Sequence, residues 1–163
     1  MFKTIVWATD GSEHADSALA VVTELARVHK SQVVAVHIDE RFRGGRFGGG
    51  AMFADEDELL GKIKHQVDEL GKQGVAARFE HVTTERHDTS ALVAEAAALV
   101  GADLIVVGTR GHGEFEAVLV GSVARGLTHD ARCPVLVVPP SPVEVTESTS
   151  EGDRALAGVG PTL

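Results

Sequence analysis

The chain has 163 residues, 44% of them hydrophobic and 24% charged, which is typical of one globular domain. Fifteen Lys and Arg stand against 24 Asp and Glu, a net charge of −9, which argues against a protein that coats nucleic acid. Cys133 is the only cysteine, so an intrachain disulfide framework is excluded. No apolar run reaches the roughly 18 residues of a membrane span, and the first residues do not read as a signal peptide. We therefore expect a cytoplasmic protein with no membrane and no nucleic-acid partner.

Four apolar runs rich in β-branched residues predict strands that are buried on both faces. They span residues 4–8, 33–38, 104–107 and 135–138. A fifth run, residues 77–82, alternates polar and apolar side chains, which indicates an edge strand with one wetter face.

Between these runs, apolar residues recur at the spacing of a helix that packs on one face. The helical segments span about residues 15–26, 59–70, 92–100 and 122–129. Ser12 is the expected N-cap of the first, and Asp88 or Thr89 of the third. Strand and helix alternate throughout, which predicts an α/β fold: an open, doubly wound, five-stranded parallel sheet with helices on both faces.

We place this core in one domain over residues 1–140. Two segments of the chain, one inside the domain and one after it, differ from the core in composition. Residues 41–50 (RFRGGRFGGG) hold five glycines and three arginines, and we expect a flexible loop inside the domain. Residues 141–163 have few large apolar side chains and a net negative charge, so a disordered acidic tail is expected there.

The segment from Gly108 to Ser122 carries the chemistry. It starts where a predicted strand ends and finishes where a helix begins, the region in which open α/β sheets bind ligands. Glycines let backbone N–H groups approach a phosphate, and a helix N-terminus at Gly121 and Ser122 offers free amides to the same anion. Arg110 adds a positive charge. The P-loop motif and the G-x-G-x-x-G turn are both absent, so the prediction depends on the spacing G-x2-G-x9-G-S.

These residues resemble the universal stress proteins, and the resemblance runs from Phe2 to about Pro139. The matching pieces, in order, are IVWATDGS at 5–12, VHID at 36–39, DLIVVG at 103–108, GSVA at 121–124 and CPVLVV at 133–138. The resemblance implies the strand order 3-2-1-4-5, Rossmann-like. It also implies a homodimer joined through the last strand, formed by Val135, Leu136, Val137 and Val138.

The glycine spacing is the mark of the ATP-binding members of that family, so the resemblance implies ATP, with Mg²⁺ bound through its phosphates. Carried over by position, Asp10 would meet the ribose or the metal-bound phosphates, and Ile38 would hold adenine through its backbone. The other implied contacts are Ala8 and Val107 lining the pocket, Gly108 at the ribose, and Gly111, Gly121, Ser122 and Val123 at the phosphates. Ala8 stands where proline is common in the family.

Simpler interpretations stand beside these. Asp10 is alternatively a turn or capping residue, and Arg110 a solvated loop residue. His37, inside a buried strand, is expected to be a hydrogen-bonded core histidine. The eight histidines lack the paired spacing of a zinc site, so no protein ligand to a metal is assigned.

The sequence thus predicts a nucleotide-binding, regulatory stress-response dimer with no catalytic residue assigned, because a Walker-type lysine and a second placed carboxylate are both missing. One alternative is a slow ATPase or phosphotransferase that uses the same pocket. Another is a binder of AMP or cyclic AMP. A structural dimer with a vacant pocket is disfavoured, because nothing in the sequence suggests another need for glycine at every position of the motif.

Overall fold

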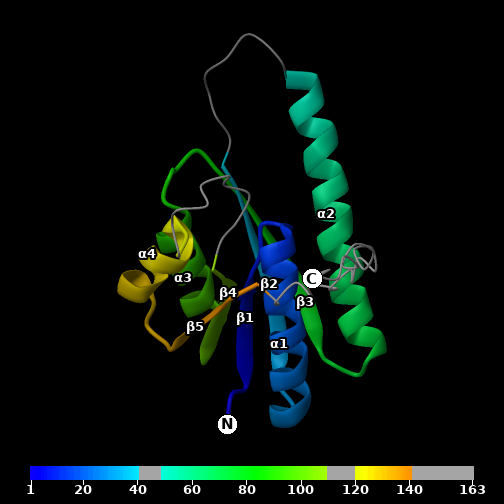
Figure 1. Ribbon diagram of the computed structural model, residues 1–163, viewed down its shortest axis with the longest axis vertical. Helices are drawn as coiled ribbons and strands as arrows, with labels where there is room; N and C mark the ends of the chain where they lie inside the picture. The colour runs from blue at the N-terminus through cyan, green and yellow to red at the C-terminus, as the bar shows by residue number, and fades with distance from the viewer. Residues whose placement is uncertain (41–48, 110–119, 141–163) are drawn as a thin grey trace, which may run out of the picture.

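In the part of the chain that the structure describes, a five-stranded parallel sheet forms the centre, with the first two helices on one face and the last two on the other (Figure 1). The computed structural model describes residues 1–40, 49–109 and 120–140, and for residues 49–55 the backbone alone. In chain order the elements are β1 (Thr4–Ala8), α1 (Glu13–His29), β2 (Gln32–Glu40), α2 (Gly49–Lys72), β3 (Ala77–Thr84), α3 (Thr89–Leu99), β4 (Leu104–Gly108), α4 (Ser122–Asp130) and β5 (Val135–Val138). The predicted alternation of strand and helix is confirmed.

The strands lie in the order β3-β2-β1-β4-β5, and all four pairings are parallel. The order implied by the family resemblance is confirmed, and so is the edge position of β3. From β1 the chain first adds β2 and β3 on one side, and then β4 and β5 on the other. The direction of winding therefore reverses between β1 and β4, which opens a crevice at their carboxyl ends.

Two apolar clusters on opposite faces explain why the strands are apolar on both sides. Ile5 and Trp7 of β1 pack toward α1 and α2, against residues such as Val22. Val6 and Ala8 point the other way and pack toward α3 and α4, with Leu127 fully buried. Alternate residues of one strand thus enter two cores, as a sheet covered on both faces requires.

The helix starts follow the expected caps. The Ser12 hydroxyl accepts a hydrogen bond from the Ala15 amide at 3.3 Å, and the Asp88 carboxylate accepts one from the Ala91 amide at 3.4 Å. Asp88 rather than Thr89 is therefore the N-cap of α3.

Helix α2 begins at Gly49, two residues inside the stretch 41–50 that was expected to be a loop. The rest of that stretch, like the tail 141–163, lies outside the described residues. Within the described ranges, no helix is both long and apolar enough to cross a membrane.

Candidate functional site

The carboxyl ends of β1 and β4 and the start of α4 meet at the crevice, near the middle of Figure 1. Ala8 and Val107 are register partners on the two strands and are 6% and 7% exposed. The Thr109 amide donates to the Val138 carbonyl at 2.9 Å, and the Thr109 carbonyl accepts from the Gly121 amide at 2.5 Å. These bonds bring Gly121 back to the end of β4, so the described residues of the predicted phosphate motif, Gly108, Gly121 and Ser122, belong to one region.

The turn after β1 is closed by short-range hydrogen bonds. Asp10 Oδ1 accepts from the Ser12 amide at 3.1 Å and from the Ser12 hydroxyl at 2.6 Å, and the Gly11 amide donates to Thr9 Oγ1 at 3.1 Å. Gly11 has a φ of +73°, and a Cβ there would overlap the Leu59 side chain of α2. The interpretation of Asp10 as a turn residue is confirmed, and its contact with a ligand stays a prediction.

Packing between α1 and β4 explains why residue 108 is a glycine. A Cβ on this residue would lie 2.6 Å from the carbonyl oxygen of His14 and 2.9 Å from its carbon, so only glycine lets the first turn of α1 approach β4 this closely. The argument that phosphate binding alone explains the glycine pattern is therefore wrong for this position.

The N-terminus of α4 has the features of an anion site. Its N-cap is Gly121, which makes no side-chain capping hydrogen bond, and Ser122 at the first helical position is exposed. Nearby, Thr109 Oγ1 is buried and finds no hydrogen-bond partner in the described part of the chain. An uncapped helix start beside a buried, unpaired hydroxyl fits an anionic group that accepts hydrogen bonds from both. Arg110 and Gly111, the other predicted contacts of this segment, lie outside the described residues.

A lysine that the sequence did not indicate contacts the same turn. Lys62 of α2 donates to the Gly11 carbonyl at 2.6 Å and pairs with Asp16 at 2.7 Å. The Lys62 ammonium thus joins α2 to the turn after β1, although the two residues are 51 positions apart in the sequence. Lys62 lies on the solvent side of the predicted helix, so hydrophobic periodicity gave no signal for this contact.

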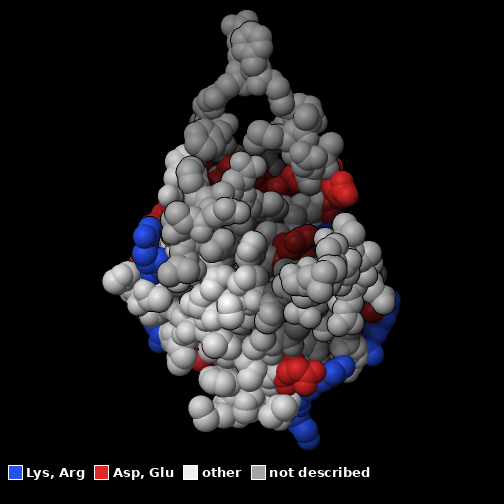
Figure 2. Space-filling view, viewed as in Figure 1, with Lys and Arg blue, Asp and Glu red and all other residues white. Residues whose placement is uncertain are grey.

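Acidic side chains gather at the carboxyl end of the sheet. Asp39 and Glu40 end β2, Asp10 follows β1, and Glu56 reaches in from α2. Figure 2 shows acidic side chains recessed in the upper half of this face, while the Lys and Arg side chains lie toward its margins. A phosphate in this region would meet the negative charge of these carboxylates, which backbone amides or a metal ion can offset.

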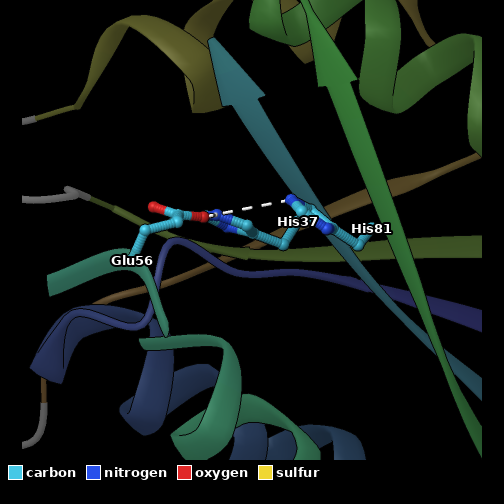
Figure 3. Close-up of side chains that lie close together, drawn as sticks. All are labelled: His37, Glu56 and His81. Atoms are coloured by element: carbon cyan, nitrogen blue, oxygen red, sulfur yellow. Dashed lines mark hydrogen bonds and ion pairs between the residues drawn. The ribbon is translucent and has the colours of Figure 1, made fainter. Parts of the chain in front are cut away.

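His37, Glu56 and His81 come together from β2, α2 and β3 (Figure 3). His37 is 5% exposed, with Nδ1 2.9 Å from the Thr9 carbonyl oxygen and Nε2 3.1 Å from Glu56 Oε1. The prediction of a buried, hydrogen-bonded histidine is confirmed, but its two neighbours were not foreseen. A signal was present, because His37 and His81 each occupy the fifth position of predicted strands that are neighbours in the implied order.

Cys133 lies half-buried before β5. Burial raises the pKa of its thiol, and the nearby Asp103 carboxylate adds to the effect. A raised thiol pKa leaves little thiolate at neutral pH, which agrees with an inert packing residue rather than a nucleophile.

Comparison with known proteins gives one consistent family. Residues 1–139 match the sequence model of the universal stress protein family. A universal stress protein of Synechocystis is 33% identical over 141 residues, covering 85% of this chain and 87% of the relative. One from Thermus aquaticus is 32% identical over 142 residues, covering 85% of this chain and 99% of its own.

Solved structures agree in fold. The hypothetical protein MJ0577 superposes with a TM-score of 0.75 at 25% identity, covering 88% of this chain and 99% of its own. Three neighbours below 25% identity show likeness of fold alone, and each was solved with an adenine nucleotide.

The first is a universal stress protein family member from Arabidopsis thaliana with AMP bound (18% identity, TM-score 0.63, covering 90% of this chain and 97% of that one). The second is the Archaeoglobus fulgidus protein with dAMP (23%, 0.59, 85% and 98%). The third is a universal stress protein in complex with cAMP (22%, 0.55, 86% and 98%). With the sequence match over residues 1–139 and the sheet order in agreement, the chain belongs to the universal stress protein family.

Proposed function

We propose that this protein binds ATP with Mg²⁺ at the carboxyl ends of β1 and β4, and acts as a regulatory dimer in the cytoplasm. The observation that carries the proposal is the start of α4. Its first amides have no side-chain cap, and the buried Thr109 hydroxyl beside it has no partner among the described residues. Both groups suit a phosphate, which accepts hydrogen bonds through several oxygens.

Each predicted contact has a place in this proposal. The amides of Ser122 and Val123 bind the phosphates, Gly121 keeps their approach free of a Cβ, and Asp10 meets the ribose or the metal-bound phosphates. The adenine lies toward β2, between the Ile38 backbone and the pocket wall formed by Ala8 and Val107. Gly111 is proposed to bind the phosphates as well, and Arg110 to supply positive charge near them; both residues lie outside the described part of the chain. Mg²⁺ on the phosphates would offset their negative charge near the carboxylates of this edge.

Binding without rapid turnover is the expected behaviour. Phosphoryl transfer needs an oriented nucleophile and charge neutralisation at the transferred group. Lys62 is a positively charged residue near the turn after β1, but its ammonium already contacts the Gly11 carbonyl and the Asp16 carboxylate. We therefore do not assign it to the transferred phosphoryl group. The proposed role is therefore regulatory: nucleotide binding between the end of β4 and the start of α4 alters the surface that the dimer presents to a partner.

A second candidate has its own support. The three nucleotide-bound neighbours hold AMP, dAMP and cAMP, each of which has a single phosphate. AMP or cyclic AMP would use the same adenine pocket and the start of α4, without needing Mg²⁺. Competition among ATP, AMP and cyclic AMP for the purified protein, with and without Mg²⁺, ranks the candidates directly.

Replacing Ser122 by aspartate separates binding from stability. A carboxylate at the first turn of α4 interacts favourably with the helix dipole and is expected to raise stability by about 0.3–1 kcal/mol. The same charge repels a phosphate at roughly 4–5 Å, which should weaken ATP binding by about ten- to a hundredfold. Isothermal titration with ATP and Mg²⁺, together with thermal unfolding of the ligand-free protein, measures both effects.

Ser122→Asn is the matched control, because asparagine has the shape of aspartate without its charge. It should bind ATP within a few-fold of the wild type. If S122D binds ATP as tightly as S122N, the phosphates do not lie at the start of α4. ADP that accumulates during the titration would instead favour the slow ATPase.

The dimer is proposed to form through β5. This strand pairs with β4 along one edge and is the last strand of the described sheet, and Leu136 on it is 37% exposed. An apolar edge strand is a ready surface for pairing with a second copy.

Leu136→Glu is expected to give monomers, because two carboxylates would meet across the symmetric interface with no partner. Leu99→Glu is the matched control, since Leu99 is an apolar residue that is 87% exposed and belongs to α3 rather than to β5. Sedimentation equilibrium should find a monomer for L136E and a dimer for L99E. A dimer of unchanged strength in L136E would exclude the β5 interface.

A further inference from the structure

His37, Glu56 and His81 form a compact group on the face of the sheet that α2 covers. Neighbouring strands place the two histidines opposite each other in register, and their rings stack with centroids 5.7 Å apart. Glu56 Oε1 lies 3.1 Å from His37 Nε2 and 3.9 Å from His81 Nε2, and one donor atom from each residue lies within 4.8 Å of the others. Figure 3 shows Glu56 extending from its helix toward both imidazoles.

The hydrogen bond on the far side of His37 fixes which nitrogen carries a proton. Nδ1 lies 2.9 Å from the carbonyl oxygen of Thr9, and a carbonyl only accepts, so Nδ1 bears the hydrogen. Nε2 then faces the Glu56 carboxylate, another acceptor, at 3.1 Å. A lone pair against a carboxylate at this distance is repulsive, so either a second proton or a metal cation must lie between them. Histidines that bind metals are commonly oriented by the same N–H to carbonyl bond.

The surroundings favour a cation that can still be reached from solvent. The His37 side chain is 6% exposed, whereas Glu56 and His81 are 28% and 26% exposed. A second carboxylate, that of Asp39, lies 3.9 Å from His81 Nε2 and is 15% exposed. Two carboxylates beside two imidazoles, partly shielded from water, provide negative charge for a dication.

We propose that His37, Glu56 and His81 bind a divalent ion of the zinc class, with water or Asp39 at a fourth position. Bonds of about 2.0–2.2 Å to nitrogen and oxygen put neighbouring ligand atoms of a tetrahedral ion roughly 3.3 Å apart. The separations of 3.1 and 3.9 Å from Glu56 Oε1 to the two ring nitrogens bracket that value, and all three ligand atoms lie within 4.8 Å of one another, so side-chain rotations would complete the site. Two imidazoles and one carboxylate suit Zn²⁺, Co²⁺ or Ni²⁺ better than Mg²⁺ or Ca²⁺, which take oxygen ligands. The three proposed ligands include none of the residues that we propose for the nucleotide phosphates.

The test uses the full-length chain without a polyhistidine tag, freed of nucleotide and stripped of metal with a chelator that is then removed. Titration with Co²⁺ alone should give visible absorption bands of a four-coordinate ion that saturate at one equivalent per chain. Added Zn²⁺ should abolish the bands and yield a dissociation constant by competition. Glu56→Gln and His81→Gln should each weaken binding by at least about tenfold, because changes even to groups behind metal ligands have effects of 10–100-fold.

His65→Gln is the matched control, since His65 lies exposed on the same helix as Glu56 and outside the cluster. It should bind Co²⁺ as the wild type does. Circular dichroism of each metal-free variant checks the fold, and E56Q, altered at a partly exposed side chain, covers the case in which H81Q does not fold. Failure of the wild type to bind one equivalent, or wild-type affinity in a folded E56Q, would overturn the proposal.

Discussion

Replacing Trp7 by alanine is expected to lower the free energy of unfolding by about 3–5 kcal/mol. Trp7 is fully buried in the cluster under α1 and α2, and it is the chain's only tryptophan. Its indole nitrogen also donates to the Ala15 carbonyl at 3.1 Å, which ties the first turn of α1 to β1. The substitution therefore leaves a cavity in the core and removes a hydrogen bond that holds the first turn of α1 against β1. Urea unfolding followed by far-ultraviolet circular dichroism measures the loss without depending on tryptophan fluorescence.

Trp7→Phe distinguishes volume from hydrogen bonding, because phenylalanine keeps an aromatic ring but has no donor. Its expected loss is about 1–3 kcal/mol, smaller than that of alanine. A loss below about 1 kcal/mol for W7A would contradict the view that this residue anchors the core.

Gly108→Ala is expected to destabilise the protein by about 1–3 kcal/mol and to weaken nucleotide binding as well. The new Cβ would meet the His14 carbonyl at 2.6 Å and the Ala15 amide nitrogen at 3.3 Å, and these are backbone atoms that cannot rotate away. Helix α1 must therefore move off β4, which strains the bond from Trp7 to Ala15. The fluorescence maximum of Trp7 reports the movement of α1, and the midpoint of urea unfolding reports the loss of stability. Titration with nucleotide measures the loss of binding.

Gly61→Ala provides the matched control, because a Cβ at Gly61 on α2 meets nothing within 4 Å. Alanine has the higher helix propensity, so this variant should be neutral or more stable by up to about 1 kcal/mol. Equal stability for G108A and G61A would show that α1 does not depend on the close approach at Gly108.

The fold was accessible from sequence because its signals are local. Four apolar runs and one alternating run give the five strands, periodic faces give the helices, and Ser12 and Asp88 mark two helix starts. The start of α2 was placed too late, since a run of three glycines ending at Gly50 has no helical propensity and the helix includes the last two. The strand order came from family resemblance, because alternation alone does not say on which side of β1 the chain next adds a strand.

The site was only partly accessible, because its contacts depend on how distant elements pack. The glycine spacing pointed to the end of β4 and the start of α4, and the structure brings these together. It did not reveal that Gly108 also accommodates α1, which requires the distance between two backbones. Lys62 and Glu56 both act from α2, and their reach is set by the position of that helix on the sheet rather than by nearby sequence.

The turn between β1 and α1 is held by contacts of two very different sequence separations. Its own hydrogen bonds join residues two or three positions apart, whereas Lys62 reaches it across 51 positions and His37 across 28. Short contacts form with little loss of chain entropy, while the long ones wait until β2 and α2 have folded back. We therefore expect the turn to take its shape early in folding, and the contacts from Lys62 and His37 to form late. A nascent chain that ends before residue 62 would hold every residue of the turn but not Lys62, so we expect the hydrogen bond from Lys62 to the Gly11 carbonyl to form only after α2 has been made.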